Sequence, residues 1–214
     1  MSSIFDLNCQ RCPRLSAFLS EVKTNYPDYH AAPVPAFGDK SPKLLIVGLA
    51  PGMHGANATG RPFTGDYAGV LLYETLYKTG FASKPESLSA DDDLRLINCR
   101  ITNAVKCLPP QNKPVGAEIN ECNSFLKAEI ESLRKGSVLL ALGSIAHNAV
   151  LKALSLKQSQ YKFGHAAEHK FDNGFMLIDS YHCSRYNTQT KRLTEDMFVK
   201  VFERARELTK IILF

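Results

Sequence analysis

The chain has 214 residues, of which 44% are hydrophobic and 22% are charged, and its formal net charge is +5. This balance excludes a disordered chain, and no apolar run approaches the roughly 18 residues of a membrane span. The mild positive charge favours a polyanionic partner without requiring one. We expect no membrane association. Because no basic stretch followed by an apolar stretch marks a signal peptide, we expect a cytoplasmic protein.

The first half of the chain predicts two helices separated by a connector, a strand and a glycine-rich loop. We expect a loop entering a helix at residues 9–26 and a connector at 31–42. The strand at 44–47, the glycine-rich loop at 48–65 and the second helix at 67–79 follow. Pro13 suits a first helical position, and the apolar run 44–47 indicates a buried strand. Gly80 is suited to end the second helix.

The second half of the chain predicts alternating strands and helices. We expect strands at 101–105, 138–142 and 175–179, and helices at 117–134, at 145–154 and from 194 onward. Gly136 is expected to end the first of these helices, while Ser144 and Thr194 are expected to cap the other two. The segments 83–93 and 180–193 are expected to be irregular polar loops.

Strands that alternate with helices indicate an α/β protein whose parallel sheet is covered by helices on both faces. We therefore expect one domain over residues 1–214, with a three-layer α/β/α fold around a central four-stranded parallel sheet. In such sheets ligands bind beyond the carboxyl ends of the strands. The loops 48–65, 102–110 and 180–193 are expected at that edge.

Four of the six cysteines form a pattern that suits a metal site. Cys9 and Cys12 form a Cys-x-x-Cys pair, and Cys107 and Cys122 stand singly farther along the chain. Four thiolates can bind a zinc ion or an iron–sulfur cluster, and one pair with two dispersed cysteines favours a cluster over a zinc ribbon. Four unrelated thiols are the alternative. Cys99 is expected to be a core thiol.

Several motifs occur in a fixed order and carry a family resemblance. They are Gly48–Gly52, Gly60–Asp66, Thr102–Cys107 followed by Pro109 and Pro110, Ala141–His147, and Ser180–Asn187. The ordered set, together with the four cysteines, resembles the uracil-DNA glycosylase superfamily, most closely its iron–sulfur members called family 5 or type B. The neighbouring family 4 shares the cysteines. The resemblance covers the chain from Cys9 to the final helix.

The resemblance implies a [4Fe-4S] cluster, with zinc as the alternative, on Cys9, Cys12, Cys107 and Cys122. In such enzymes the cluster is regarded as structural. It would tie an N-terminal cluster-binding segment and connector, residues 1–42, onto the rest of the domain.

The resemblance also implies a base pocket at the mouth of the sheet. Its walls would be formed by Gly48, Leu49, Ala50 and Pro51. Phe63 would stack on an everted base, Asn103 would read the base edge, and His182 would donate to it. Ser184 and Arg185 are expected to contact DNA phosphates.

The sequence departs from the superfamily pattern at two places. Many members carry a carboxylate or amide at the second or third position of the first motif, where Leu49 and Ala50 stand here. Asp66 is then the candidate for the residue that orients water. It would equally suit the N-cap of the helix at 67–79, and the two roles are compatible. Cys183 replaces the usual proline of the last motif, which is expected to loosen that loop.

The implied function is excision of damaged bases from DNA. With Asp66, Asn103 and His182 as catalytic residues, the enzyme would flip uracil, and also hypoxanthine and xanthine, out of double-stranded or single-stranded DNA. It would hydrolyse the N-glycosidic bond and leave an abasic site. No lysine nucleophile is apparent, so we expect a monofunctional enzyme, acting as a monomer. A nucleic-acid-binding protein without catalysis and a redox or zinc protein with no role on DNA are the alternatives.

Overall fold

The computed structural model describes residues 5–209, which form a six-stranded sheet with the strand order β1-β3-β2-β4-β6-β5. The four central strands are parallel to one another: β3 (Cys99–Asn103), β2 (Leu44–Gly48), β4 (Val138–Leu142) and β6 (Met176–Ser180). The α/β class and the parallel four-stranded core are confirmed. The ends of the predicted domain, residues 1–4 and 210–214, lie outside the described residues.

Two short antiparallel strands extend the sheet at its edges and are not predicted by the sequence pattern. β1 (Phe37–Gly38) pairs with β3 inside the expected connector, and β5 (Glu168–Lys170) pairs with β6. β1 has only two residues, and the three residues of β5 are all polar. Neither strand therefore carries the apolar run or alternation by which strands are detected.

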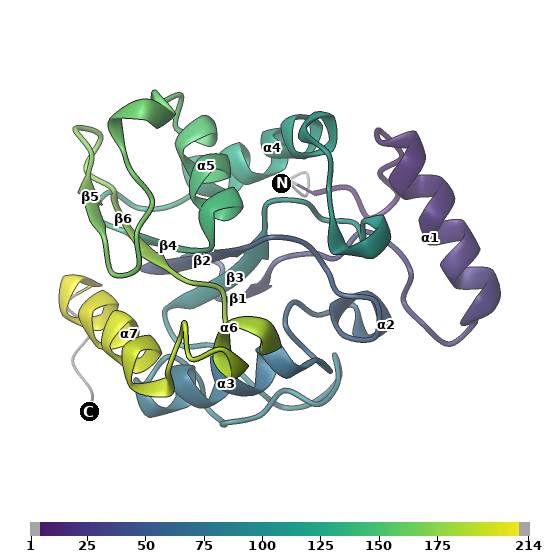
Figure 1. The fold of residues 1–214 in the computed structure, drawn as a ribbon, viewed down its shortest axis with the longest axis horizontal. Helices are drawn as coiled ribbons and strands as arrows, with labels where there is room; N and C mark the ends of the chain where they lie inside the picture. The colour runs from purple at the N-terminus through teal and green to yellow at the C-terminus, as the bar shows by residue number, and fades with distance from the viewer. Residues whose placement is uncertain (1–4, 210–214) are drawn as a thin grey trace.

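Helices cover both faces of the sheet, so the molecule has three layers (Figure 1). One face carries α4 (Gly116–Glu131) and α5 (Ser144–Ala153), and the other carries α3 (Tyr67–Lys78) and α7 (Glu195–Thr209). Strand β2 supplies both cores, because successive side chains point to opposite faces. Leu44 and Ile46 belong to the core beneath α3 and α7, while Leu45 and Val47 belong to the core beneath α4 and α5.

The helix ends differ from the predictions in two places. Ser144 is the first residue of α5 and makes no capping hydrogen bond; the cap is Gly143, whose φ of +100° suits glycine. α4 ends at Glu131, so Gly136 lies in the following turn and does not end the helix. Thr194, by contrast, caps α7 as predicted, because its hydroxyl accepts from the amide of Met197 at 3.2 Å.

The predicted loops contain short helical segments. The glycine-rich loop includes α2 (Ala56–Thr59), and the polar loop after β6 includes α6 (Arg185–Gln189). Short 3₁₀ turns occur at η1 (Pro110–Asn112) and η2 (Gln158–Gln160). Both short helices follow the carboxyl end of a parallel strand, where they shape the rim of the candidate site.

The N-terminal helix α1 (Pro13–Asn25) begins at Pro13, as predicted, and lies at one side of the sheet (Figure 1). Its apolar residues Leu15, Leu19 and Val22 pack in a separate core with residues that follow β3 and with α4. Within residues 5–209, no helix has the length and apolar character needed to span a membrane.

Candidate active site

The site is built where the parallel strands end. The register pairs Gly48 of β2 with Asn103 of β3, so the first and third motifs meet side by side. A Cβ atom on Gly48 would lie 2.4 Å from Asn103 Oδ1 and 2.7 Å from Phe63 Cζ. Glycine is therefore required there, because Asn103 and Phe63 close over the backbone of Gly48.

A cavity of about 580 Å³ opens beside these residues. Its lining includes eight of the predicted site residues: Leu49, Ala50, Phe63, Asp66, Asn103, His182, Ser184 and Arg185. Gly48 and Pro51 are buried and are not among the lining residues; Gly48 lies beneath Asn103 and Phe63. The volume is within the roughly 300–1,000 Å³ of typical small-molecule sites.

Phe63 forms one wall and has an unusual backbone. Its φ is +55°, in the left-handed region that bulky residues rarely adopt. Its ring stacks near the ring of His182, with centroids 5.9 Å apart and planes 29° from parallel. Gly69 allows this conformation, because a Cβ there would fall 1.8 Å from the Phe63 carbonyl oxygen.

His182 faces the same cavity in an uncharged form. Burial lowers the pKa of His182 to about 4, so the imidazole is neutral at physiological pH. A neutral imidazole still carries one N–H donor. The loop that presents it is anchored: Asn187 Nδ2 donates to the His182 carbonyl at 2.8 Å, and Cys183 is fully buried in the core. The cysteine packs against the core, and the loosening expected from the missing proline stays a prediction.

Asp66 is the N-cap of α3, as predicted, and it also faces the cavity. Its carboxylate caps α3 by accepting from the Gly69 amide at 2.9 Å, and it also lines the cavity. It lies against Gly55, where a Cβ would be 2.6 Å from Asp66 Oδ2. Burial raises the pKa of Asp66 above its ordinary value, against the opposing effect of backbone hydrogen bonds from Gly69 and Ala68. That Asp66 orients a water molecule stays a prediction.

Asn103 lines the cavity and carries one buried polar atom without a partner among the described residues. The residue is 3% exposed, and its Oδ1 has no hydrogen-bond partner among the described residues. A buried amide oxygen without a partner is costly in a folded protein, and such groups are often completed by a ligand or water. The edge of a nucleobase presents the complementary donors and acceptors.

The four cysteines of the predicted metal site line one cavity between α1, α4 and the segment after β3. All four of Cys9, Cys12, Cys107 and Cys122 belong to its wall, with Lys106 and Phe125. The amide of Lys106 donates to Cys122 Sγ at 3.3 Å. None of the cysteines forms a disulfide; all six lie within the described residues. Cys99 is fully buried in the main core, as predicted.

The spacing of the four sulfur atoms bears on what they can hold. Zinc–thiolate bonds of about 2.3 Å in a tetrahedron place the sulfurs about 3.8 Å apart. Among the described residues, three candidate ligand atoms lie within 4.8 Å of one another at His147, His169 and Asp179. No three of the cysteine sulfur atoms in the described part of the chain lie that close together. Which metal group these thiols hold stays a prediction.

The group of His147, His169 and Asp179 is a hydrogen-bonded unit that sequence reasoning does not find. His147 Nδ1 lies 2.8 Å from Asp179 Oδ1, and His147 Nε2 lies 3.1 Å from the Tyr161 carbonyl oxygen. Both ring nitrogens face oxygen atoms, an arrangement that favours the doubly protonated ring. Burial lowers the pKa of His147, but the hydrogen bond and charge of Asp179 outweigh it, so the pKa is raised.

Some residues of the cavity wall are not identified by the sequence. Tyr67 and Asn112 are two of them, whereas His54, which also lines the cavity, is expected there from its place in the first-motif loop. The Arg185 guanidinium lies over the Tyr67 ring, 5.1 Å from its centroid, which fixes the predicted DNA-contacting residue at the rim. Tyr67 directly follows Asp66, so a signal existed for it. Asn112 has no such signal, since a turn with φ of +56° brings it to the site.

The fold and cavity define an α/β protein with a polar, aromatic-walled site at the carboxyl ends of its parallel strands. The chain matches the family model of the Uracil DNA glycosylase superfamily over residues 35–206. It is 46% identical to the Type-5 uracil-DNA glycosylase of Thermus thermophilus, over 94% of this chain and 93% of that protein. It is 39% identical to the Type-5 uracil-DNA glycosylase of Mycobacterium tuberculosis, over 98% of this chain and 83% of that protein. It is 31% identical to the Type-4 uracil-DNA glycosylase of Archaeoglobus fulgidus, over 71% of this chain and 62% of that protein.

The chain therefore belongs to the uracil-DNA glycosylase superfamily. The resemblance to its family 5 members, inferred from the order of the motifs, is confirmed by the Type-5 relatives.

Proposed function

We propose that this protein is a DNA-repair enzyme that hydrolyses the N-glycosidic bond of uracil in DNA and leaves an abasic site. The observation that carries the proposal is that Phe63, Asn103 and His182 line one cavity together with Asp66. These residues come from different motifs far apart in the sequence, and a base pocket needs all of them together. The relatives named Type-5 uracil-DNA glycosylase support the same activity.

The target base must leave the duplex to reach this cavity, because its glycosidic bond is buried in the stack. In the proposed complex the everted base stacks on Phe63, while the Asn103 amide pairs with the base edge. Base–aromatic stacking recovers about 1–3 kcal/mol of the cost of extrusion. Ser184 and Arg185, on the rim of the cavity, contact the phosphates of double-stranded DNA.

The chemistry is cleavage of the bond between the base nitrogen and C1′ of the sugar. The bonding electrons leave with the base, and His182 donates a hydrogen bond to the base oxygen on which negative charge develops. Asp66 orients a water molecule, whose oxygen forms the new bond to C1′. The water loses one proton, and the departing base gains one. No residue forms a covalent bond to the sugar, so the enzyme does not cut the strand.

The first motif supports a wider range of bases. Leu49 and Ala50 line the cavity where many superfamily members carry a polar side chain. Apolar walls reject a larger base only weakly, because they leave no polar group unpaired. Hypoxanthine and xanthine are therefore proposed as further substrates.

Cys9, Cys12, Cys107 and Cys122 would hold a [4Fe-4S] cluster. Bound there, the cluster supplies a crosslink between the N-terminal segment, residues 1–42, and the chain after β3. Iron and sulfide analysis with visible absorption of anaerobically purified protein tests this assignment. Zinc without iron would overturn it. The enzyme is proposed to act as a monomer in the cytoplasm.

The test uses duplexes that carry one uracil, hypoxanthine or xanthine, with Asp66→Asn and Asp66→Ala as paired variants. Asparagine caps helices as well as aspartate, so Asp66→Asn should keep the melting temperature while losing about 10²–10⁴-fold in single-turnover rate. Asp66→Ala should lose the same rate and about 1 kcal/mol of stability. Equal rates in the parent and Asp66→Asn would remove Asp66 from catalysis. A parent protein that binds DNA without excising any base would favour the non-catalytic binder.

A further inference from the structure

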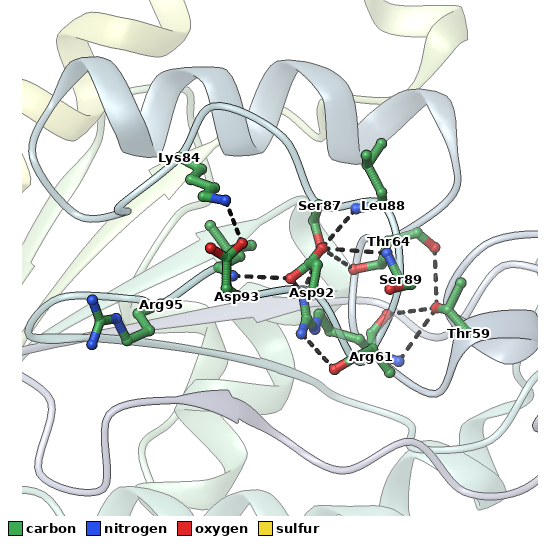
Figure 2. A network of polar contacts seen from close by, with 12 residues as sticks. Thr59, Arg61, Thr64, Lys84, Ser87, Leu88, Ser89, Asp92, Asp93 and Arg95 are labelled. Atoms are coloured by element: carbon green, nitrogen blue, oxygen red, sulfur yellow. Dashed lines mark hydrogen bonds and ion pairs between the residues drawn. The ribbon is translucent and has the colours of Figure 1, made fainter.

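Arg61 is a charged residue buried two positions before Phe63. Its side chain is 4% exposed and is not part of the cavity wall. Its Nη1 donates to Asp92 Oδ1 at 2.5 Å and to Ser87 Oγ at 3.1 Å, and its Nη2 donates to the Ala90 carbonyl at 2.6 Å. The guanidinium also lies over the Phe37 ring, 4.2 Å from its centroid. Figure 2 shows the polar part of this network.

Asp92 holds the other side of the network. Its carboxylate accepts from the amides of Leu88, Ser89 and Leu94 at 2.9, 3.3 and 3.1 Å. These bonds fold the irregular segment between α3 and β3 around one carboxylate. Although burial alone would raise it, the pKa of Asp92 falls to about 2, chiefly through the Arg61 hydrogen bond and these amides. The segment is thus a built support for Arg61 and not a loose connection.

Hydrogen bonds of the same network fix the backbone on both sides of Phe63. Thr64 Oγ1 lies 2.7 Å from Ser87 Oγ, and Tyr73 Oη donates to the Pro62 carbonyl at 2.8 Å. Thr59 Oγ1 lies within hydrogen-bond distance of the carbonyls of Arg61 and Thr64. A phenylalanine with φ of +55° persists only where its surroundings determine its conformation. Here the surroundings are these bonds.

We propose that Arg61 and Asp92 are positioning residues that act through Phe63, holding its ring in the orientation that receives an everted base. Neither residue touches the substrate. The inference rests on the proposed function of the same cavity. It assigns the segment 83–95 a part in catalysis that its sequence does not indicate.

The chain provides a matched control one residue away. Asp93 forms an ion pair with Lys84 on the surface, and neither side chain is buried (Figure 2). Asp92→Asn and Asp93→Asn remove the same charge from neighbouring positions. We expect Asp92→Asn to lower the single-turnover excision rate about tenfold at a temperature where it is fully folded, and Asp93→Asn to stay within about twofold of the parent.

A double-mutant cycle separates positioning from a general loss of stability. In a Phe63→Leu background, Asp92→Asn should change the rate by no more than about twofold, because the ring through which it acts is gone. Its effect on melting temperature should be the same in both backgrounds. If Asp92→Asn does not fold, Ser87→Ala removes the hydroxyl contacts to Arg61, Thr64 and Tyr73 and is expected to show the same pattern with a smaller loss.

Three outcomes would overturn the inference. Equal rates for Asp92→Asn and Asp93→Asn would show that the buried pair has no part in the reaction. An undiminished effect of Asp92→Asn in the Phe63→Leu background would show that it does not act through the ring. An inactive parent protein would remove the proposed function as well, whereas the first two outcomes leave that function intact.

Discussion

The charge state of His182 determines what this side chain can contribute. An imidazolium would be a stronger donor, but keeping it charged in a buried site would be costly. Burial lowers the pKa of His182 to about 4, so the ring stays neutral and its N–H is a fixed donor that needs no proton from solvent. The pKa of Asp66 shifts in the opposite direction, because burial raises it. The two groups thus have opposite shifts that suit a neutral donor and a basic carboxylate.

These shifts predict the pH profile of excision. Asp66 must be ionised to orient water, so the single-turnover rate should fall as pH drops through its raised pKa, which lies above the ordinary value of 3.8. His182 is neutral throughout, so it should add no limb between about pH 5 and 8. Rates measured across this range, with Asp66→Asn as the variant that lacks the acid limb, check the assignment. A limb near the ordinary histidine pKa that disappears in His182→Gln would contradict it.

At the level of single residues, the sequence predicts the chemistry of the site better than its walls. Phe63, Asp66, Asn103 and His182 lie within recognisable motifs, and the cavity contains all of them. Arg61 lies in the same motif, yet its role depends on Asp92, which stands in a segment without pattern. A contact between residues 31 positions apart cannot be read from local composition.

At the level of elements, the sequence predicts what is buried and fails where strands are exposed. β2 and β4 are continuous apolar runs, and β4 spans the predicted residues. β1 and β5 form only because a neighbouring strand offers free backbone groups at the sheet edge, which is a property of the assembled sheet. Ser144 is misassigned as a cap for a similar reason: Gly143, with its positive φ, already turns the chain into α5.

The segment that contains β5 is held to the sheet through His147 and Asp179, since Tyr161 contacts the His147 ring and His169 contacts the Asp179 carboxylate. Asp179 is fully buried in β6, and it also accepts from His169 Nε2 at 3.2 Å. Replacing His147 by glutamine would remove its hydrogen bond and its charge from this carboxylate, and breaking a buried pair of this kind costs up to about 3–5 kcal/mol when the histidine is protonated. Asp196→Asn, which breaks the exposed pair with Lys200, should cost less than about 1 kcal/mol.

The stabilisation from His147 should depend on pH in a defined direction. Its folded pKa is raised, so the contribution is fully present below the unfolded value of 6.5 and is lost as pH rises through the folded pKa. Chemical unfolding at several pH values should therefore show the largest gap between the parent and His147→Gln on the acidic side, narrowing above pH 6.5. A gap that widens with rising pH would mean that His147 is neutral in the folded protein.

On the scale of the whole molecule, the N-terminal segment has a small apolar interface of its own. Leu15, Leu19 and Val22 of α1 pack against the chain after β3 and against α4, apart from the two main cores. The predicted metal ligands lie in this interface, two before α1 and two on the elements that it meets. Few apolar residues are buried there, so a covalent link between the two sides would supply much of the attachment.

Loss of one ligand should therefore release the N-terminal segment before the rest unfolds. Cys12→Ser is expected to lose iron and to destabilise the protein by about 2–4 kcal/mol, by analogy with a disulfide of similar span. For a chain of this size, that lowers the melting temperature by roughly 4–16 °C. Limited proteolysis should then cut first in the connector between α1 and β2.

Cys99→Ala, at a fully buried cysteine outside the cavity, should retain iron and resist cleavage there. If Cys12→Ser keeps its iron and its protease resistance, the crosslink is not what holds α1 in place, and packing by Leu15, Leu19 and Val22 suffices.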